Sequence, residues 1–267
     1  MGRGYFTRPL PRLFGHRGAA GIAPENTMAS FRRAFEDGAD YFELDVHATR
    51  DGVVVVIHDP TLERTTNGAG AVRDLTFAEL ERFDAGFRFV HGGSYAFRGQ
   101  GVRVPALEEL LEEFPEVPLN IEIKQAEPPI EPAVVSLLER KGALDRVVLA
   151  AEDDRIIRRI RAHAPGSATS ASYGEVRDFF ERCFADRFEG YVPEARALQI
   201  PDRFGDIDLV SPETLAAARR FGLEVHVWTV NEESEIERLL RLGVDGVMSD
   251  FPSRLVAVAR GRSSANP

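Results

Sequence analysis

Short apolar segments alternate with amphipathic segments along nearly the whole chain. The apolar segments, such as 53–57 and 147–151, have the length of strands, whereas amphipathic segments such as 130–141 carry apolar residues at helical spacing. Alternation of this kind predicts βα units around a parallel sheet. When the predicted strands at 41–46 and 53–57 are counted together as part of one βα unit, the chain contains eight βα units. Eight units close a (β/α)8 barrel of about 250 residues.

The predicted elements follow from this periodicity and from helix-stop and turn signals. We expect strands at 13–15, 41–46, 53–57, 119–124, 147–151, 168–171, 197–200, 224–230 and 246–249. We expect helices at 26–37, 106–114, 130–141, 153–163, 173–186, 213–221, 232–242 and 254–260. An open doubly wound sheet is the alternative fold, but it usually carries a glycine-rich phosphate turn after its first strand. Here that position reads His16-Arg17-Gly18-Ala19-Ala20, which is no dinucleotide fingerprint.

Residues 60–105 break the alternation. They contain several glycines, no long periodic segment, and a stretch rich in Phe, Gly and Arg at 83–103. We expect them to form a small insertion between the second and third barrel strands that folds over one end of the core. Because the alternation resumes after them, we predict a single domain over residues 1–267.

The composition, with 43% hydrophobic and 28% charged residues, is that of an ordinary soluble globular protein. The longest apolar run, 53–57, is far shorter than the roughly 20 residues of a membrane-spanning helix. Residues 1–12 carry arginines but no apolar stretch, so we expect no signal peptide. The lone Cys183 allows no internal disulfide, which suits a reducing compartment, and we expect a cytoplasmic protein.

The net charge of −10 produces an overall field that repels polyanions. Nucleic acid is therefore disfavoured as a partner. A small anionic substrate would need a bound cation or a few well-placed basic groups near its binding site. The sequence leaves the oligomeric state open.

Three acidic residues on two predicted strands form a candidate metal site. Glu43 and Asp45 are two residues apart, so both side chains point to one face of their strand. Glu122 and Lys124 repeat this pattern on a later strand. Three inward carboxylates predict an oxygen-rich site for Mg²⁺ or Ca²⁺, and the sequence does not separate the two ions. Two alternatives stay open, a solvent-facing acid pair or an internal Glu122–Lys124 ion pair with no ligand.

Two histidines are predicted at the same end of the barrel. His16 directly follows the first strand, and His58 ends the third. A hairpin that turns at Asp51-Gly52 has equal arms on both sides, which places His58 opposite Asp45. A single histidine after a strand is more often structural than catalytic. Two that converge on acids and basic residues indicate a catalytic site, because imidazole titrates near neutral pH.

Seven motifs occur in an order and at a spacing that closely resemble those of glycerophosphodiester phosphodiesterases. They are His16-Arg17-Gly18-Ala19, Pro24-Glu25-Asn26-Thr27, Glu43-Leu44-Asp45-Val46, His58-Asp59-Pro60, Arg64-Thr65-Thr66-Asn67-Gly68, Glu122-Ile123-Lys124 and Val227-Trp228-Thr229-Val230-Asn231. Each motif alone is weakly specific, whereas the ordered set, from residue 13 to about residue 255, is highly specific. The resemblance implies a TIM barrel related to phosphatidylinositol-specific phospholipases C, with residues 60–105 as its insertion.

The resemblance also implies a role for each chemical position, and no catalytic position departs from the family's pattern. His16 and His58 correspond to the general acid and base, and Glu43, Asp45 and Glu122 to the divalent-metal ligands. Arg17 and Lys124 correspond to phosphate contacts, Glu25 to an acid near the substrate glycerol or the metal, and Trp228 to an aromatic of the substrate cavity.

The implied reaction is metal-dependent hydrolysis of small glycerophosphodiesters to sn-glycerol 3-phosphate and an alcohol, a step of lipid and glycerol metabolism. The sequence leaves open which histidine gives the proton, whether water or the glycerol 2-hydroxyl attacks, and which headgroup leaves. A lysophospholipase D-type activity is an alternative if the Phe-rich segment 83–97 supplies an apolar entrance, although such aromatics more often form the insertion's own core. A non-catalytic phosphate-binding barrel would lack a histidine or an acid, and none is missing.

Overall fold

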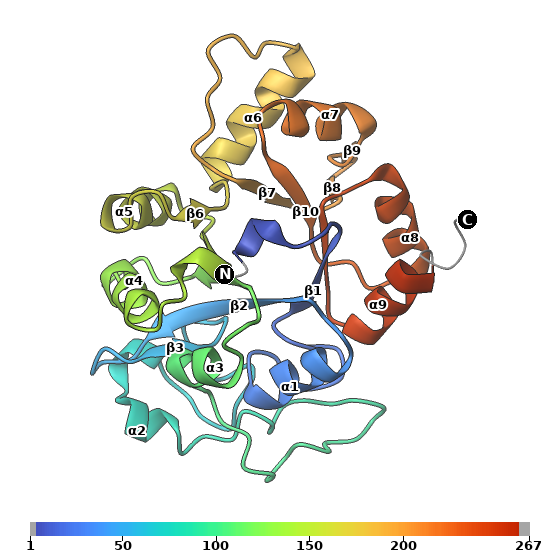
Figure 1. The fold of residues 1–267 in the computed structure, drawn as a ribbon. Helices are drawn as coiled ribbons and strands as arrows, with labels where there is room; N and C mark the ends of the chain where they lie inside the picture. The colour runs from blue at the N-terminus through green and yellow to red at the C-terminus, as the bar shows by residue number, and fades with distance from the viewer. Residues whose placement is uncertain (1–3, 262–267) are drawn as a thin grey trace.

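A barrel of parallel strands lies at the centre of the molecule, inside an outer ring of helices (Figure 1). This computed structural model describes residues 4–261, and the ends of the predicted domain, residues 1–3 and 262–267, lie outside the described part. Strands and helices alternate along the chain, so the predicted (β/α)8 architecture is confirmed.

Eight parallel strands form the barrel in the described residues. Around the ring they are β1 (Arg12–His16), β2 (Tyr41–Ala48), β4 (Leu119–Ile123), β5 (Val147–Ala150), β6 (Ala168–Thr169), β7 (Ala197–Ile200), β10 (Glu224–Val227) and β11 (Gly246–Ser249), and β11 pairs again with β1. β6 and β7 meet at a parallel bridge between Ser170 and Ala197. The amide of Ala171 also donates to the carbonyl of Ala197 at 2.8 Å, which closes the ring.

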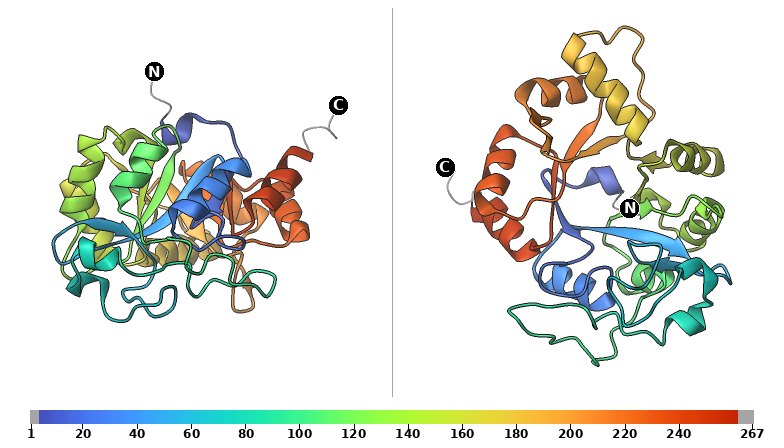
Figure 2. Two further views of the ribbon diagram at one scale, coloured as in Figure 1. Left: turned by 90° about the horizontal axis from the view of Figure 1, so that it is seen from below. Right: turned by 180° about the vertical axis from the view of Figure 1, so that it is seen from behind.

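Each barrel strand leads into a helix on the outside of the barrel, as the side view of Figure 2 also shows. These helices are α1 (Met28–Glu36), α3 (Leu107–Glu113), α4 (Glu131–Arg140), α5 (Asp154–His163), α6 (Tyr173–Ala185), α7 (Pro212–Arg220), α8 (Glu233–Leu242) and α9 (Pro252–Gly261). Capping explains several boundaries. The hydroxyl of Thr27 accepts a hydrogen bond from the amide of Ser30 at the start of α1, and α8 ends at Gly243, whose φ of 87° favours glycine. No described helix is long and apolar enough to span a bilayer.

Alternation along the strands gives the barrel wall an apolar outer face and a mixed inner face. Phe42, Leu44 and Val46 of β2 are fully buried and belong to the core formed with the surrounding helices. Glu43 and Asp45, between them, therefore point into the barrel, as predicted from their spacing. The helices thus bury the outer face, and the inner face carries polar groups beside a small apolar cluster that includes Phe14 and Tyr41.

β3 (Val54–Val56) returns antiparallel to β2, with Val56 opposite Val46. The amide of Ile57 donates to the carbonyl of Asp45 at 3.0 Å, so the predicted pairing of His58 with Asp45 is wrong by one residue. The reason is the turn: Thr49 pairs with Val53, which leaves a three-residue loop rather than a turn centred between two residues.

The segment 60–105, predicted as an insertion, contains two short helices, η2 (Val72–Asp74) and α2 (Phe77–Leu80). Together with β3 and Ile57, this segment forms a small separate apolar core. Its buried residues are Val55, Ile57, Leu62, Val72, Leu80, Ala85 and Val104. The sequence reading missed one hairpin, β8 (Arg203–Phe204) with β9 (Ile207–Asp208), because its strands are two residues long and exposed. Strands β6 and β10 also end two and three residues earlier than expected.

A buried cation lies at the amino-terminal end of the barrel, near the short helices η1 (Tyr5–Thr7) and η3 (Leu144–Arg146). Arg12 is 1% exposed, and its guanidinium donates to both carboxylate oxygens of Glu224, at 2.5 and 2.6 Å. It also donates to the carbonyl of Tyr5 at 3.0 Å. Burial alone would raise the pKa of Glu224, but the hydrogen bonds from Arg12 and His226 outweigh it and lower that pKa to about 2.

Replacing Glu224 by Gln should destabilise the protein by about 3 kcal/mol, because it leaves the Arg12 charge buried with a neutral partner. Urea unfolding at pH 7 measures this difference. Since the pKa of Glu224 is lowered on folding, its contribution is present above pH 4.5 and is lost as the pH falls towards 2. The difference in free energy of unfolding between wild type and Glu224→Gln should therefore become smaller in that range. A difference that does not depend on pH would contradict the role of the ion pair.

Candidate active site

The predicted acids and the first histidine lie on β1, β2 and β4, at the level where β1 and β4 end. His16 is the last residue of β1, and Glu122 lies one residue before the end of β4. Strands β2 and β4 are neighbours, and Asp45 lies beside Glu122 in their register. In a (β/α)8 barrel this end of the strands forms the mouth, where the βα loops gather. The fold therefore collects these groups at one place.

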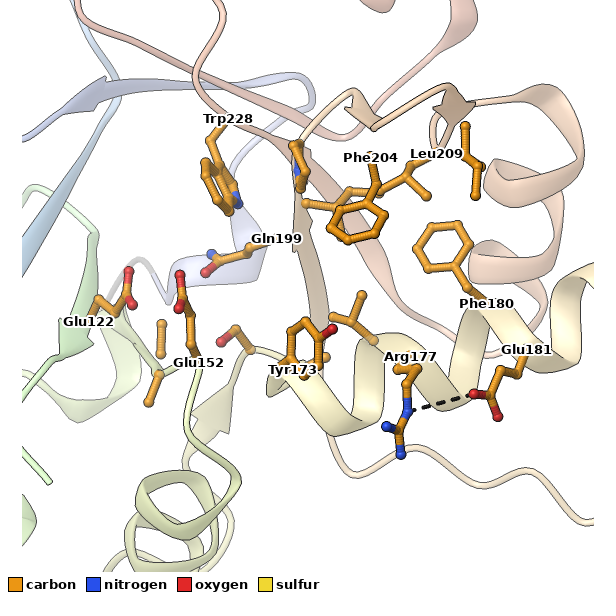
Figure 3. A pocket seen from close by; sticks show the side chains of 18 of the residues that line it. Glu122, Glu152, Tyr173, Arg177, Phe180, Glu181, Gln199, Phe204, Leu209 and Trp228 are labelled. Atoms are coloured by element: carbon orange, nitrogen blue, oxygen red, sulfur yellow. Dashed lines mark ion pairs between the residues drawn. The ribbon is translucent and has the colours of Figure 1, made fainter.

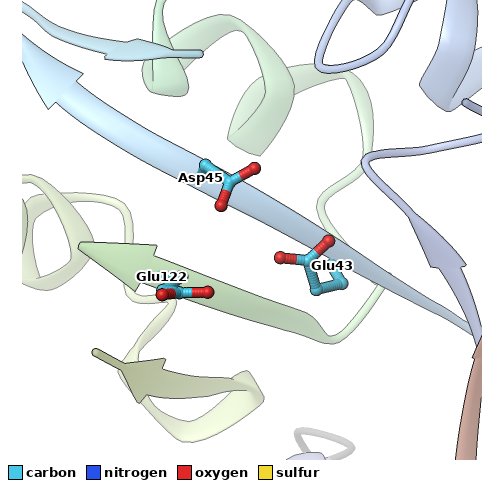
Figure 4. Close-up of side chains that lie close together, drawn as sticks. All are labelled: Glu43, Asp45 and Glu122. Atoms are coloured by element: carbon cyan, nitrogen blue, oxygen red, sulfur yellow. The ribbon is translucent and has the colours of Figure 1, made fainter. Parts of the chain in front are cut away.

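Three carboxylates converge inside the mouth from two adjacent strands (Figure 4). One oxygen from each of Glu43, Asp45 and Glu122 lies within 4.8 Å of the others. Glu43 and Asp45 are only 4% and 1% exposed. Burial, and after it the charge of Asp45, raises the pKa of Glu43 to about 7. Burial likewise raises the pKa of Glu122.

Carboxylates with raised pKa values lack enough nearby positive charge to stabilise their ionised forms. A divalent cation supplies that charge, and Mg²⁺ and Ca²⁺ both prefer oxygen donors of this type. The donor set of Glu43, Asp45 and Glu122 therefore fits such an ion. This fit rests on three oxygen donors at close range, two of them buried and the third, Glu122, partly buried, and not on acidity alone.

Two basic side chains border the acids. The ammonium of Lys124 donates to Glu122 Oε1 at 2.6 Å and lies 3.5 Å from Asp45 Oδ1. The alternative ion pair of Glu122 with Lys124 is thus present, but within the acid cluster rather than in place of it. Arg17 adopts a φ of 49°, and its amide donates to Glu43 Oε2 at 3.0 Å. Its guanidinium Nε lies 3.2 Å from Asp45 Oδ2.

The loop after β1 supplies two further contacts to this cluster. Arg17 Nη1 donates to Glu25 at 2.9 Å, and the guanidinium of Arg64 donates to both oxygens of Glu25, at 2.7 and 2.8 Å. Burial alone would raise the pKa of Glu25, but the bonds from Arg64 and the charge of Arg17 lower it. The side-chain amide Nδ2 of Asn26 donates to Asp45 Oδ2 at 2.9 Å. Glu25 thus lies beside the acids but outside the group of three.

His16 is oriented by a carboxylate from the far end of the chain. Its Nδ1 lies 2.7 Å from Asp250 Oδ1, and its Nε2 lies 3.8 Å from Glu43 Oε2. Asn231 in turn holds Asp250, because its amide donates to Asp250 Oδ2 at 2.7 Å. Burial alone would lower the pKa of His16, but the hydrogen bond to Asp250 and the charge of Glu43 outweigh it and raise that pKa. The ring is therefore fixed with Nε2 towards the acids.

His58 has a similar partner. Its Nδ1 lies 2.6 Å from Asp59 Oδ1, and Arg64 Nε donates to Asp59 Oδ2 at 2.6 Å. The hydrogen bond from Arg64 is the main cause that lowers the pKa of Asp59 to about 2. The backbone carbonyl of His58 accepts a bond from His47 Nε2 at 3.0 Å. Both candidate catalytic histidines thus use Nδ1 for a carboxylate, which leaves Nε2 for chemistry.

Trp228 directly follows β10 and lines a pocket of about 450 Å³ that also reaches Glu122 (Figure 3). The predicted aromatic of the substrate cavity therefore borders a real cavity next to the acids. Trp228 is 36% exposed, so its ring is accessible. The pocket extends from Glu122 towards α6 and the β8–β9 hairpin.

The sequence reading missed the residues that orient the two histidines. The sequence analysis assigns no role to Asp250 or Asn231. Asp250 directly follows β11, at the end of a barrel strand that reaches the mouth. Asp59 and Arg64 were quoted within motifs without a role. Their partners could not be read from spacing, because Asp250 and His16 are separated by 234 residues and meet only when β11 pairs with β1.

Comparison with known proteins gives one consistent result. Residues 16–254 match the sequence model of the Glycerophosphoryl diester phosphodiesterase family. A glycerophosphodiester phosphodiesterase from Caldanaerobacter subterraneus is 35% identical over 255 residues, which are 93% of this chain and 97% of that protein. A lysophospholipase D from Mus musculus is 30% identical and covers 93% of this chain and 86% of its own length.

A solved structure shows the same fold. The structure of a phosphodiesterase from Oleispira antarctica, in complex with the product sn-glycerol-3-phosphate, superimposes with a TM-score of 0.76 at 28% identity. The match covers 94% of this chain and 97% of that one.

The acid cluster predicts divalent-ion binding that can be measured without any substrate. Isothermal titration of the metal-free protein with Ca²⁺ or Mg²⁺ should show one binding event, and Asp45→Asn should weaken it by about tenfold or more because the site loses a charged ligand. Glu139→Gln, an exposed acid on α4, is the matched control and should bind like wild type. Absence of binding to the wild-type protein would contradict the metal assignment.

Proposed function

The chain belongs to the glycerophosphoryl diester phosphodiesterase family and is a phosphoric diester hydrolase, and we propose that it hydrolyses glycerophosphodiesters to sn-glycerol 3-phosphate and an alcohol. The observation that supports this reaction best is a pair of histidines of which His16 lies beside the buried Glu43 and His58 is connected to the acids through a chain of charged hydrogen bonds. His16 and His58 each have a carboxylate on Nδ1, and His16 directs Nε2 towards Glu43. The sn-glycerol-3-phosphate bound in the Oleispira antarctica phosphodiesterase agrees with this product.

The two histidines perform the proton transfers in this proposal. One accepts the proton of the attacking hydroxyl, and the other gives a proton to the oxygen of the leaving alcohol as its bond to phosphorus breaks. Asp250 and Asp59 hold the imidazole rings in place and stabilise each when it carries the extra proton. The same pair serves attack by water and attack by the substrate's own glycerol 2-hydroxyl, since a cyclic phosphate is then opened by reversing the two roles.

Positive charge around the phosphate is the second requirement, because nucleophilic attack adds charge to its oxygens. Glu43, Asp45 and Glu122 would hold a divalent cation, which would act as a Lewis acid on the phosphoryl oxygen. Arg17 and Lys124 lie at the same acids and present guanidinium and ammonium groups to a phosphate bound there. Glu25, fixed by Arg17 and Arg64, is placed to accept hydrogen bonds from the glycerol hydroxyls.

Neither alternative function, a lysophospholipase D-type activity or a non-catalytic phosphate-binding barrel, is supported by particular residues. In the Phe-rich segment 83–97, Phe89 packs edge-on against Phe97 with ring centroids 5.5 Å apart, and Phe83 packs on the insertion's apolar core. These contacts make the segment part of the insertion rather than an apolar entrance. A non-catalytic barrel is also disfavoured, because His16 lies 3.8 Å from Glu43 of the three-acid group and His58 is connected to the same group through Asp59, Arg64 and Glu25.

His16→Ala and His58→Ala should each lower the turnover of glycerophosphocholine by several orders of magnitude, since each proton transfer contributes about 10²–10⁴-fold and positioning is lost with it. A coupled assay for released sn-glycerol 3-phosphate measures this. His163→Ala, an exposed histidine on α5, is the matched control and should keep full activity. Losses below tenfold at both His16 and His58 would contradict the two-histidine mechanism.

Chelation should abolish activity reversibly. After treatment with excess EDTA and its removal, turnover of glycerophosphocholine should fall to background, and added Mg²⁺ or Ca²⁺ should restore it because the acid cluster is refilled. Circular dichroism before and after chelation checks that the fold persists. Full activity in excess EDTA would show that the reaction needs no exchangeable ion.

A further inference from the structure

The pocket beside Glu122 differs in chemistry from the acid and histidine site. Its inner end lies at the mouth of the barrel, at Glu122, Gln199 and Trp228, and its outer part runs between α6 and the β8–β9 hairpin (Figure 3). His16, His58 and Glu25 do not line it. A phosphodiester held at the acids would therefore have its glycerol side towards Glu25 and its other side towards this pocket.

Uncovered aromatic and apolar side chains gather along this pocket. Of the ten large apolar side chains that are most exposed in the described residues, five line it: Tyr173, Phe184, Phe204, Ile207 and Trp228. A cluster of uncovered apolar side chains beside a catalytic site is typical of a ligand-binding groove. The exposed ring faces of Trp228 and Tyr173 are available for a ligand to stack on.

The charged groups of the pocket are mostly negative. Arg177 is the one cationic side chain among the described lining residues, and it lies 3.6 Å from Glu181 at the outer part of the pocket. Glu152, at the inner end, has no cationic partner in the described residues, where its carboxylate forms no hydrogen bond or ion pair. Its charge acts on Glu122 instead, whose pKa it helps to raise. Figure 3 shows the two carboxylates near one another, below Trp228.

An unpaired carboxylate beside exposed aromatic faces is the combination that binds an organic cation. Aromatic faces attract ammonium groups and suit methylated ones best, because their surface is apolar and their charge is spread. Glu152 is exposed, so its attraction to a bound cation is that of a solvent-screened pair, and its charge disfavours a negatively charged group.

We propose that this pocket receives the leaving alcohol and that Glu152, Trp228 and Tyr173 select an alcohol that bears a methylated ammonium group. The proposal rests on the phosphodiesterase activity proposed above. It makes Glu152 a specificity residue that touches the leaving alcohol and takes no part in the proton transfers.

The test compares two glycerophosphodiesters of the same shape. One is sn-glycero-3-phosphocholine, and the other is its neutral carbon analogue, the 3,3-dimethylbutyl ester. Wild-type kcat/KM should favour the choline ester by roughly fivefold to tenfold, since a cation–π contact and one exposed charge pair are each worth a small factor. The Glu152→Gln and Tyr173→Leu variants should each lower this ratio, and Glu181→Gln, which removes an equal charge from the outer part, should leave the ratio unchanged.

Inhibition gives a second measurement that needs no variant. Choline should inhibit the wild-type enzyme at a concentration severalfold lower than 3,3-dimethylbutanol does, because the two alcohols differ only in charge.

Equal kcat/KM for the two esters, or preference for the neutral one, would overturn the proposal and show a purely apolar subsite. An unchanged ratio in Glu152→Gln would also overturn it. If the wild-type enzyme with added Mg²⁺ or Ca²⁺ hydrolysed neither ester, the proposed function itself would fail, and the inference would fail with it.

Discussion

Three carboxylates on two adjacent strands, two of them buried and one partly buried, are the constraint on which the site depends. Glu43, Asp45 and Glu122 are brought together because β2 and β4 pair in register, and strand alternation turns all three inward. Like charges at such distances inside a protein are unfavourable unless cations lie among them. Arg17, in a left-handed conformation, and Lys124 supply positive charge next to these acids from the loops around the mouth.

Charged hydrogen bonds also surround the two histidines. Asp250 and Asn231 come from the ends of the chain's last strands and hold His16, and Asp59 with Arg64 holds His58. Arg64 also binds Glu25, so the insertion is connected to the loop after β1 by charged hydrogen bonds. The positions of the two histidines are therefore set by a continuous network and not by each strand separately.

The strand pattern and the acids could be predicted because both depend on local periodicity. Alternation of apolar and acidic residues in β2 determines which side chains face the barrel interior, and the (β/α)8 count follows from repeated segments. The hairpin register could not be predicted from equal spans, because a three-residue loop shifted it by one position. The partnership of His16 with Asp250 depends on closure of the barrel between β11 and β1, which no local pattern encodes.

Closure of the ring between β6 and β7 rests on a shorter ladder than the others, since Ser170 and Ala197 form an isolated bridge there. Local opening begins where the fewest hydrogen bonds must break. This seam lies within the pocket, with Ser170 on one side and Gln199 on the other, whereas the acids are on β2 and β4. In the binding mode proposed above, the leaving alcohol therefore contacts the part of the barrel wall with the fewest inter-strand hydrogen bonds, whereas the phosphate lies at the longer β2–β4 ladder.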